Sequence, residues 1–316
     1  MDSMDRMDIR IPGNLEHEAS PLSEEQLRLR EEISEGVIRG GIDLHLHSTA
    51  SDGTLPPEKF PDFAASQGLS LFSLTDHDSI DGHLAVENRI RERLSEGLQS
   101  PAFIPGVELS LRTGKNEEIH LLGYFPTTEA AKALQPFIEK QRRARRERNA
   151  QLLEKLRSAG YAVDGEAVEK MAKGQLGRVH FALYLIQEGY VESVEEAFRR
   201  ILGEGGSCYI PRRPLNPFKG IQAISEAGGL SYLAHPFKWK AFAEPERFEE
   251  ELRELKEGGL VGLEAFHGDA KPEETKVLLR SAKRLGLSIS AGSDWHGGHK
   301  KTRAAFSGGT HFDLKA

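Results

Sequence analysis

Short apolar runs that alternate with helix-like segments constrain the fold of this 316-residue chain more than any other feature. From residue 41 onward there are seven such runs: GIDLHLHS, LSLFSLTDHD, AFIPGVELS, EEIHLLGYF, GLSYLAHPF, GLVGLEAFH and LSISAGSDWH. Several of the helix-like segments between them end in glycine, which commonly follows the last turn of a helix. Strand–helix alternation predicts right-handed crossovers and a parallel sheet. About seven such units can close into a barrel whose functional side chains lie at the carboxyl ends of the strands.

One region interrupts this alternation and thereby suggests domain boundaries. Residues 126–214 contain no clear strand and read as several helices. We expect them to form a helical insertion that covers the site, between barrel segments 41–125 and 215–316. Residues 1–40 are polar and rich in glutamate, and we expect an N-terminal extension outside the catalytic core. Within it, residues 23–38 predict one helix, with Ser23 as cap and Gln26 three positions on.

Composition restricts the class of protein. Apolar residues make up 38% of the chain and charged residues 29%, which suits a folded protein. The formal net charge of −7 argues against a protein that binds long duplex nucleic acid. It permits a small phosphorylated substrate, since bound metal cations would dominate the electrostatic field at the site. No apolar run approaches the roughly 18 residues of a membrane span, and no export signal is visible. The single cysteine, Cys208, is expected to be buried, and it fits a cytoplasmic location. The oligomeric state stays open.

Histidines and carboxylates collect at the ends of the apolar runs. In DLHLHSTASDG (43–53), the alternation places His45 and His47 on one side of a strand, with Asp52 in the following loop. The other runs carry, in order, Asp76, His77 and Asp78; Glu108; His120; His235; Glu264 and His267; and Asp294 and His296. Unpaired buried polar groups are costly, and metal ions would satisfy all of these at once. Imidazole and carboxylate without thiolate suit Zn, Mn or Fe.

Some of these polar residues have simpler interpretations. We expect Asp78 to be the N-cap of a helix that starts near Ser79. Asp76 is expected to orient a metal ligand from behind. His83 is expected to face solvent from the middle of a helix, and His120 alone would also fit an ordinary buried histidine bonded to the backbone.

The motifs DLHLHSTASDG, LTDHDSIDG, PGVELS, IHLLGYF, LAHPF and AGSDWHG, in this order, resemble those of the PHP family. This is the polymerase and histidinol phosphatase superfamily of metal-dependent phosphoesterases. The insertion, through LGRVHFALYLI and EEAFRRILGEGGSCYIP, resembles one branch. That branch includes 3′,5′-nucleoside bisphosphate phosphatases, some of which also trim short 5′-phosphorylated RNA. The resemblance implies an α/β fold, a distorted (β/α)7 barrel (the PHP fold) with an inserted small helical domain.

The resemblance also implies three divalent metal ions, with Mn, Fe and Zn all open as identities. Carried over motif by motif, it assigns His45, His47, Glu108 and Asp294 to the first metal; Glu108, His120 and His235 to the second; and Asp52, His77 and His296 to the third. No ligand is missing, which indicates an active enzyme. The first 40 residues depart from the family pattern, in which the HxH motif lies close to the chain start.

The implied reaction is hydrolysis of the 3′-phosphate of nucleoside 3′,5′-bisphosphates, with removal of 5′-terminal nucleotides from short 5′-phosphorylated RNA as a further activity. Arg178 and His180, in GRVHF, match the branch pattern for substrate contact. The planar guanidinium group of arginine can donate two hydrogen bonds to a second phosphate, so Arg178 is also a candidate catalytic residue. His267 is the best-placed general acid among the residues not used as ligands, and it would then touch substrate.

The run QRRARRERN (141–149) has two interpretations. Arg142, Arg145 and Arg146 share one helical face, while Arg143 can pair with Glu147. In the usual interpretation, these arginines form a solvent-exposed face of the helix. In the alternative, they attract anionic oligonucleotides to the site.

Three other functions fit the sequence less well. An amidohydrolase also opens with HxH on a barrel strand, but it commonly uses a bridging lysine, whereas here Glu108 takes that place and no lysine ends a strand. A non-enzymatic metal-binding or proofreading accessory module is disfavoured by the complete ligand set. Histidinol phosphatase is the nearest rival within the family, and the insertion that carries Arg178 favours the nucleotide branch.

Overall fold

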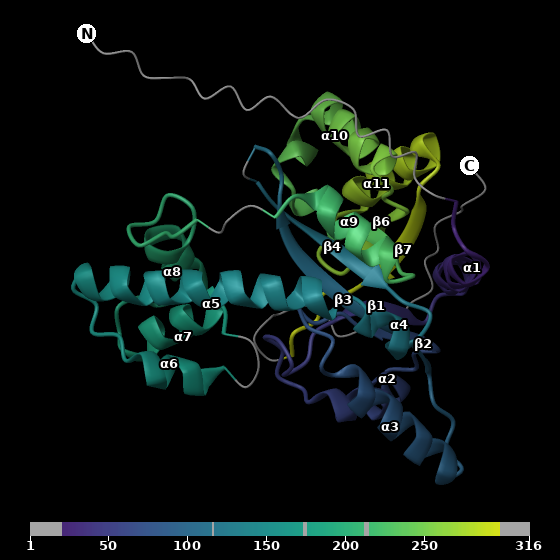
Figure 1. Ribbon diagram of the computed structural model, residues 1–316, viewed down its shortest axis with the longest axis horizontal. Coiled ribbons are helices and arrows are strands. Elements are labelled where there is room, and N and C mark those ends of the chain that lie inside the picture. The colour runs from purple at the N-terminus through teal and green to yellow at the C-terminus, as the bar shows by residue number, and fades with distance from the viewer. Residues whose placement is uncertain (1–20, 116, 173–175, 212–214, 298–316) are drawn as a thin grey trace.

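A computed structural model describes residues 21–115, 117–172, 176–211 and 215–297. Seven strands form one sheet in sequence order: β1 (Ile42–Leu46), β2 (Leu71–Leu74), β3 (Ala102–Arg112), β4 (Glu118–Tyr124), β5 (Leu230–Leu233), β6 (Gly262–His267) and β7 (Ser288–Gly292). The segment after β7 returns to β1, where the backbone N–H of His47 donates to the carbonyl of Trp295 at 2.9 Å. The sheet is therefore nearly closed into a seven-stranded α/β barrel (Figure 1). All seven apolar runs became strands, as predicted.

The expectation of an all-parallel sheet was wrong at one strand. β4 is antiparallel to both β3 and β5, while the remaining neighbours are parallel. The cause is the connection between β3 and β4, which spans only residues 113–117. A parallel neighbour needs a crossover of a dozen or more residues, so this short turn can only form a hairpin.

Helices cover the outside of the barrel. On one side are α2 (Phe60–Ser66), α3 (His83–Ser95) and α4 (Thr128–Lys132); on the other are α9 (Pro217–Glu226), α10 (Pro245–Glu257) and α11 (Pro272–Leu285). Short 3-10 turns η1 (Pro57–Lys59), η3 (Pro236–Lys238) and η4 (Lys240–Ala243) complete the loops. No helix within the described ranges is both long and apolar enough to cross a membrane.

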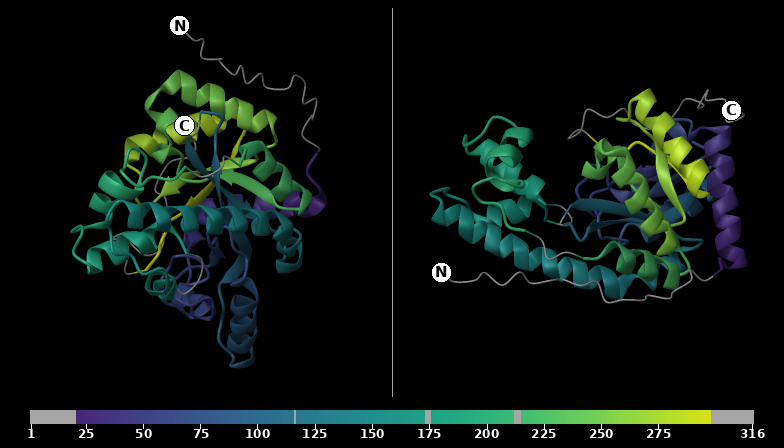
Figure 2. Two further views of the ribbon diagram at one scale, coloured as in Figure 1. Left: turned by 60° about the vertical axis from the view of Figure 1, so that its left-hand side comes forward. Right: turned by 90° about the horizontal axis from the view of Figure 1, so that it is seen from above.

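The helical insertion is built on one long helix. α5 (Gln135–Ser158) starts in the barrel's apolar core at Ile138 and ends in a second core that includes Leu152 and Leu156. That second core also packs α6 (Gly165–Met171), α7 (Arg178–Gln187), α8 (Val194–Ala197) and the π-helical turn η2 (Phe198–Leu202). Cys208 is buried there, as expected. Figures 1 and 2 show these helices standing out to one side of the barrel.

The N-terminal helix belongs to the barrel core, contrary to our expectation that it would lie outside. α1 (Glu24–Arg39) has the predicted capping box, since the Ser23 hydroxyl accepts from the backbone of Gln26 at 3.2 Å and Gln26 reciprocates. Its Leu29, Ile33 and Val37 are buried in the main apolar cluster of the barrel. Figure 2 shows α1 at the end of the barrel away from the insertion. The apolar i, i+4 spacing of these three residues is visible in the sequence and indicates a helix with one buried face.

Candidate metal centre and adjoining cavity

Glu108, on β3, lies at the centre of the predicted site and is fully buried. Five imidazoles surround its two oxygens, contributed by β1, the loop after β2, β4 and the turn after β5. Oε2 lies 3.2 Å from His45 Nε2 and 3.1 Å from both His47 Nε2 and His77 Nδ1, and Oε1 lies 2.7 Å from His120 Nδ1 and 3.0 Å from His235 Nε2. Both oxygens of Glu108 are thus placed among imidazoles that could hold metal together with it.

The first predicted ligand group is complete in space. Asp294 Oδ1 lies 3.5 Å from His45 Nε2 and 3.3 Å from His47 Nε2, on the same side of Glu108. The alternation in β1 explains this geometry, because Leu44 and Leu46 point into apolar clusters while the two histidines face the opposite way.

The third predicted group also converges. Asp52 Oδ1 lies 3.3 Å from His296 Nε2, and its Oδ2 lies 3.9 Å from His77 Nε2. His47 Nδ1 is 3.7 Å from Asp52 Oδ1, so this imidazole faces both groups. All nine predicted ligands therefore gather in one place.

Many of these buried atoms have no hydrogen-bond partner within the described residues. They include Nε2 of His45, both ring nitrogens of His47, Nδ1 of His77 and Oε2 of Glu108. Orphaned polar atoms in a protein interior are costly, and divalent cations would satisfy these nitrogens and oxygens together. The donor set of imidazoles and carboxylates thus fits the metals that the motifs imply.

The close approach of carboxylates and imidazoles determines the protonation of both at this site. Burial disfavours the charged form of Glu108, but the imidazoles of His77, His120 and His45 outweigh burial and hold its pKa well below the usual range. Burial also opposes the charge on His47, yet the neighbouring carboxylates of Asp294 and Glu108 raise its pKa to about 9. The Glu108 carboxylate is therefore ionised, as a carboxylate that binds metal must be.

Backbone strain marks two of the ligands. His235 and Asp294 have positive φ angles of 30° and 55°, in the left-handed region that side chains with a Cβ rarely adopt. Such conformations cost about 1–3 kcal/mol each and cluster at functional sites. Each is the second residue after a strand, β5 or β7, where the unusual backbone turn directs its side chain toward the ligand group around Glu108.

Two carboxylates that we had not assigned a role hold the ligands in position. Glu264 on β6 places Oε1 3.0 Å from His45 Nδ1, while its Oε2 accepts from the backbone N–H of His235 at 2.7 Å. Asp43 on β1 accepts from the Ser293 hydroxyl at 2.6 Å and thereby fixes the strand end before Asp294. Asp43 lies at period two before His45, so the sequence did contain its signal.

Asp76 and its neighbours act differently from our expectations. Asp76 accepts from Ser48 and Ser51 hydroxyls at 2.6 and 2.5 Å, so it orders the loop that leads to Asp52 rather than touching a ligand. Asp78 is no N-cap, because α3 begins only at His83; it has a positive φ and accepts from the backbone of Ser110 at 3.1 Å. His83 is buried, not solvent-facing, with Nε2 2.8 Å from the carbonyl of Gly106.

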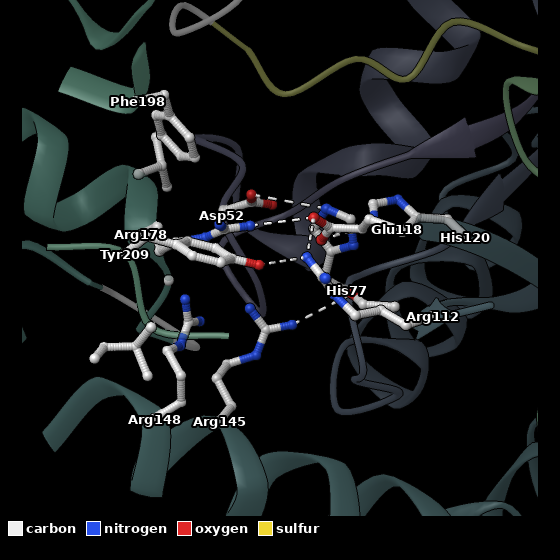
Figure 3. A pocket seen from close by; sticks show the side chains of 14 residues that line it. Asp52, His77, Arg112, Glu118, His120, Arg145, Arg148, Arg178, Phe198 and Tyr209 are labelled. Carbon is white, nitrogen blue, oxygen red and sulfur yellow. Dashed lines mark hydrogen bonds and ion pairs between the residues drawn. The ribbon is translucent and has the colours of Figure 1, made fainter. Parts of the chain in front are cut away.

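A cavity of about 160 Å³ lies between the barrel and the insertion (Figure 3). We call it the arginine cavity because four arginines line it: Arg112 from β3, Arg145 and Arg148 from α5, and Arg178 from the start of α7. Its barrel wall contains the predicted ligands Asp52, His77 and His120. Cationic side chains and metal ligands therefore face the same small volume.

The arginines are held by specific partners. Arg178 Nη2 lies 3.2 Å from Glu118 Oε2, and its guanidinium sits 5.4 Å from the centroid of the Phe198 ring. Arg112 Nη2 donates to the Tyr209 hydroxyl at 2.9 Å. Tyr209 lies within the EEAFRRILGEGGSCYIP motif of the insertion, but we predicted no role for it.

The arginine run on α5 is less solvated than we expected. Arg145 lines the cavity and pairs with Asp78, and Arg142 donates to the Asp78 carbonyl at 3.2 Å. Arg143 pairs with Glu147 at 3.2 Å, as predicted, and Arg146 is exposed.

Two predicted substrate contacts, His180 and His267, do not line the arginine cavity. His180 is buried, is not part of the lining, and accepts through Nδ1 from the backbone of Gly177 at 3.0 Å, which fixes the helix start beside Arg178. His267 is buried next to His45 and Glu264, and its Nε2 lies 3.8 Å from Asp294 Oδ2.

Comparison with known proteins agrees with this geometry. The PHP domain family matches residues 43–207. The chain belongs to the PHP family of metal-dependent phosphoesterases. This PHP enzyme is 32% identical to a 5′-3′ exoribonuclease of Haemophilus influenzae, over 80% of this chain and 89% of that protein. It is 30% identical to a 3′,5′-nucleoside bisphosphate phosphatase of Chromobacterium violaceum, over 81% and 87%. A solved structure described as a metal-dependent phosphoesterase, from Bifidobacterium adolescentis, superposes with a TM-score of 0.70 at 28% identity, covering 84% of this chain and 90% of that one.

Proposed function

We propose that this PHP enzyme hydrolyses the 3′-phosphate of nucleoside 3′,5′-bisphosphates and releases 5′-terminal nucleotides from short 5′-phosphorylated RNA. The observation that carries the proposal is the arginine cavity, which shares the ligands Asp52, His77 and His120 with the metal centre. A substrate with one phosphate needs no second cationic site. A nucleotide with a phosphate at each end of its ribose would place one at the ligands and the other among the arginines.

The proposed cofactor is a set of three divalent cations, Mn, Fe or Zn, held by the three predicted ligand groups. When bound, such cations neutralise phosphate oxygens and activate water for attack on phosphorus. Phosphoryl transfer needs mainly positioning and charge neutralisation, which the surrounding side chains would complete.

The chain's own residues would bind and orient the nucleotide. Arg178 would exchange its contact with Glu118 for the 5′-phosphate, because the guanidinium fork matches phosphate geometry. Phe198, which lies under Arg178, adds an aromatic wall to the same cavity. His267 is the proposed general acid, since its buried Nε2 has no hydrogen-bond partner within the described residues.

Two further points belong to the proposal. A cytoplasmic location is proposed because the chain has a single, buried cysteine. Single-stranded fragments are the proposed RNA substrates, since the net charge of −7 disfavours broad contact with a duplex.

The test is a substrate panel with manganese-loaded protein. The panel contains adenosine 3′,5′-bisphosphate, adenosine 3′-monophosphate, histidinol phosphate, and one short RNA with either a 5′-phosphate or a 5′-hydroxyl. We expect kcat/KM to be at least about 10-fold higher for the bisphosphate than for the monophosphate, because charge-assisted hydrogen bonds contribute about 1.5–3 kcal/mol. For the same reason, kcat/KM should be higher for the 5′-phosphorylated RNA than for the same RNA with a 5′-hydroxyl. Phosphate release from histidinol phosphate alone would overturn the proposal.

A further inference from the structure

A second cavity, of about 200 Å³, adjoins the metal centre. It shares Glu118 and His120 with the arginine cavity and has no other lining residue in common with it, so the two lie on different sides of this pair. Besides His120, the second cavity borders the predicted ligand His235. A substrate held at the ligands would therefore reach both cavities.

Four of the eight residues that line the second cavity are apolar; the others are the shared Glu118 and His120, together with His235 and Lys238. Ile119, Leu233, Ala234 and Trp239 supply the apolar walls. Lys238 is the cation; its Nζ lies 3.1 Å from Asp294 Oδ2 and 3.4 Å from Asp269 Oδ2, so it stands between the metal ligands and the cavity. Apolar walls with one cation suit a nucleoside followed by a phosphate.

The wall formed by Trp239 is fixed by a chain of contacts. Its indole Nε1 donates to Glu117 Oε2 at 3.0 Å, and Arg247 Nη2 lies 2.6 Å from the same oxygen. Glu117 lies in the β3–β4 turn and Arg247 on α10. The indole is therefore held from two separate elements, which keeps the cavity open in one shape.

We propose that the second cavity binds the second nucleotide of a 5′-phosphorylated RNA, on the 3′ side of the scissile phosphate. This inference rests on the proposed function, which places the first nucleotide's 5′-phosphate in the arginine cavity and its 3′-phosphorus at the ligands. Water attacks that phosphorus, the P–O3′ bond breaks, and O3′ leaves with a proton. The phosphoryl group stays on O5′ of the second nucleotide, which becomes a new 5′-phosphorylated end.

The second cavity then separates the two activities of the site. A bisphosphate has no substituent on its 3′-phosphate and leaves this cavity empty. A phosphodiester carries a nucleoside there and must place it beside His120 and His235, where the second cavity lies. The walls of this cavity should therefore affect diester cleavage much more than bisphosphate hydrolysis.

Two variants of one residue test this inference. Trp239→Ala removes the aromatic wall, whereas Trp239→Phe keeps a ring but loses the hydrogen bond to Glu117. We measure kcat/KM for a 5′-phosphorylated dinucleotide and for adenosine 3′,5′-bisphosphate, and we compare their ratio. Stacking of a base on an aromatic side chain contributes about 1–3 kcal/mol, so the ratio should fall about 5- to 150-fold in Trp239→Ala and stay within about 3-fold in Trp239→Phe.

Other outcomes are distinguishable. An unchanged ratio of the two kcat/KM values in Trp239→Ala would overturn the subsite. An equal fall of this ratio in Trp239→Ala and Trp239→Phe would also overturn it, because the effect would then come from the lost hydrogen bond to Glu117 and not from the aromatic ring. Wild-type protein that hydrolyses the bisphosphate but never the dinucleotide would also overturn the subsite while the phosphatase activity stands. Wild-type protein that hydrolyses neither would refute the proposed function itself.

A binding measurement avoids dependence on turnover. Trp239 is one of two tryptophans in the chain, so the difference in emission between the wild type and Trp239→Phe reports on Trp239. A dinucleotide with CH2 in place of O3′ cannot be cleaved, and it should change tryptophan emission more in the wild type than in Trp239→Phe, which keeps only Trp295. Adenosine 3′,5′-bisphosphate should leave the Trp239 component unchanged. An equal emission change in wild type and Trp239→Phe would contradict the placement of the second nucleotide.

Discussion

Nδ1 of His120 lies 2.7 Å from Oε1 of Glu108, although the two residues sit on strands that run in opposite directions. The parallel strands present their carboxyl ends to the site, so an antiparallel strand can contribute only from its amino end. His120 is the third residue of β4 (Glu118–Tyr124) and meets this condition. The hairpin that departs from the parallel prediction is therefore what brings His120 to Glu108.

Glu108→Gln should remove metal from the site. The substitution keeps size and shape but removes the charge that five imidazoles surround. We expect metal content per chain to fall and kcat/KM to drop by more than about 100-fold, since even contacts outside the ligand shell contribute 10- to 100-fold. Metal analysis together with phosphate release checks this. Glu226→Gln, on the outer helix α9, is the matched control and should retain full metal content. Full metal content in Glu108→Gln would contradict a bridging role.

Metal-stripped protein should lose stability as pH rises from about 6.5 to about 10. Glu108 and Asp294 raise the pKa of His47 from 6.5 to about 9, and Glu108 is the main cause that raises the pKa of His120 from 6.5 to about 10, both against the effect of burial. The folded state then binds more protons than the unfolded state over this range, so the free energy of unfolding decreases with pH. Thermal unfolding in chelator at several pH values measures the effect.

Metal-loaded protein should lack this pH dependence, because cations replace the protons on these imidazoles. Metal binding should also release protons, which calorimetry in buffers of different ionisation enthalpy would count. A rise in the melting temperature of metal-stripped protein between pH 7 and 9 would contradict the protonation of His47 and His120.

The strands and the metal ligands were predictable from the sequence because both depend on local patterns. Alternation indicated the direction of His45 and His47, and the short apolar runs or the loops after them carried the remaining ligands. The arginine cavity was not predictable in the same way. Arg112 and Tyr209 are 97 residues apart and meet only because the insertion folds back over β3. Likewise, His83 looked exposed because its partner, the Gly106 carbonyl, lies on a different element.

Arg178→Ala should weaken the use of a second phosphate. We expect kcat/KM for adenosine 3′,5′-bisphosphate to fall about 10- to 150-fold, because one charge-assisted hydrogen bond to the second phosphate is lost. The change in kcat/KM for adenosine 3′-monophosphate should be much smaller. Arg178→Lys keeps the charge but loses the planar fork and should give an intermediate value. Steady-state kinetics on both substrates measure this. Arg199→Ala, an exposed position in the same insertion, is the control. Equal losses on both substrates would point to damage at the metal centre instead.

Ile33→Ala should destabilise the whole barrel, although it lies in a helix that we had expected outside the core. Ile33 is fully buried against the main apolar cluster, and truncation of a buried isoleucine costs about 2–5 kcal/mol. Ile38, five residues along on the same helix, is 66% exposed, so Ile38→Ala should change the free energy of unfolding by less than about 0.5 kcal/mol. Both substitutions affect helix propensity alike, so their difference isolates packing. Urea unfolding of the two variants gives that difference. Equal free energies of unfolding for the two variants would mean that α1 does not pack against the barrel, because truncation of Ile33 would then remove no buried contact.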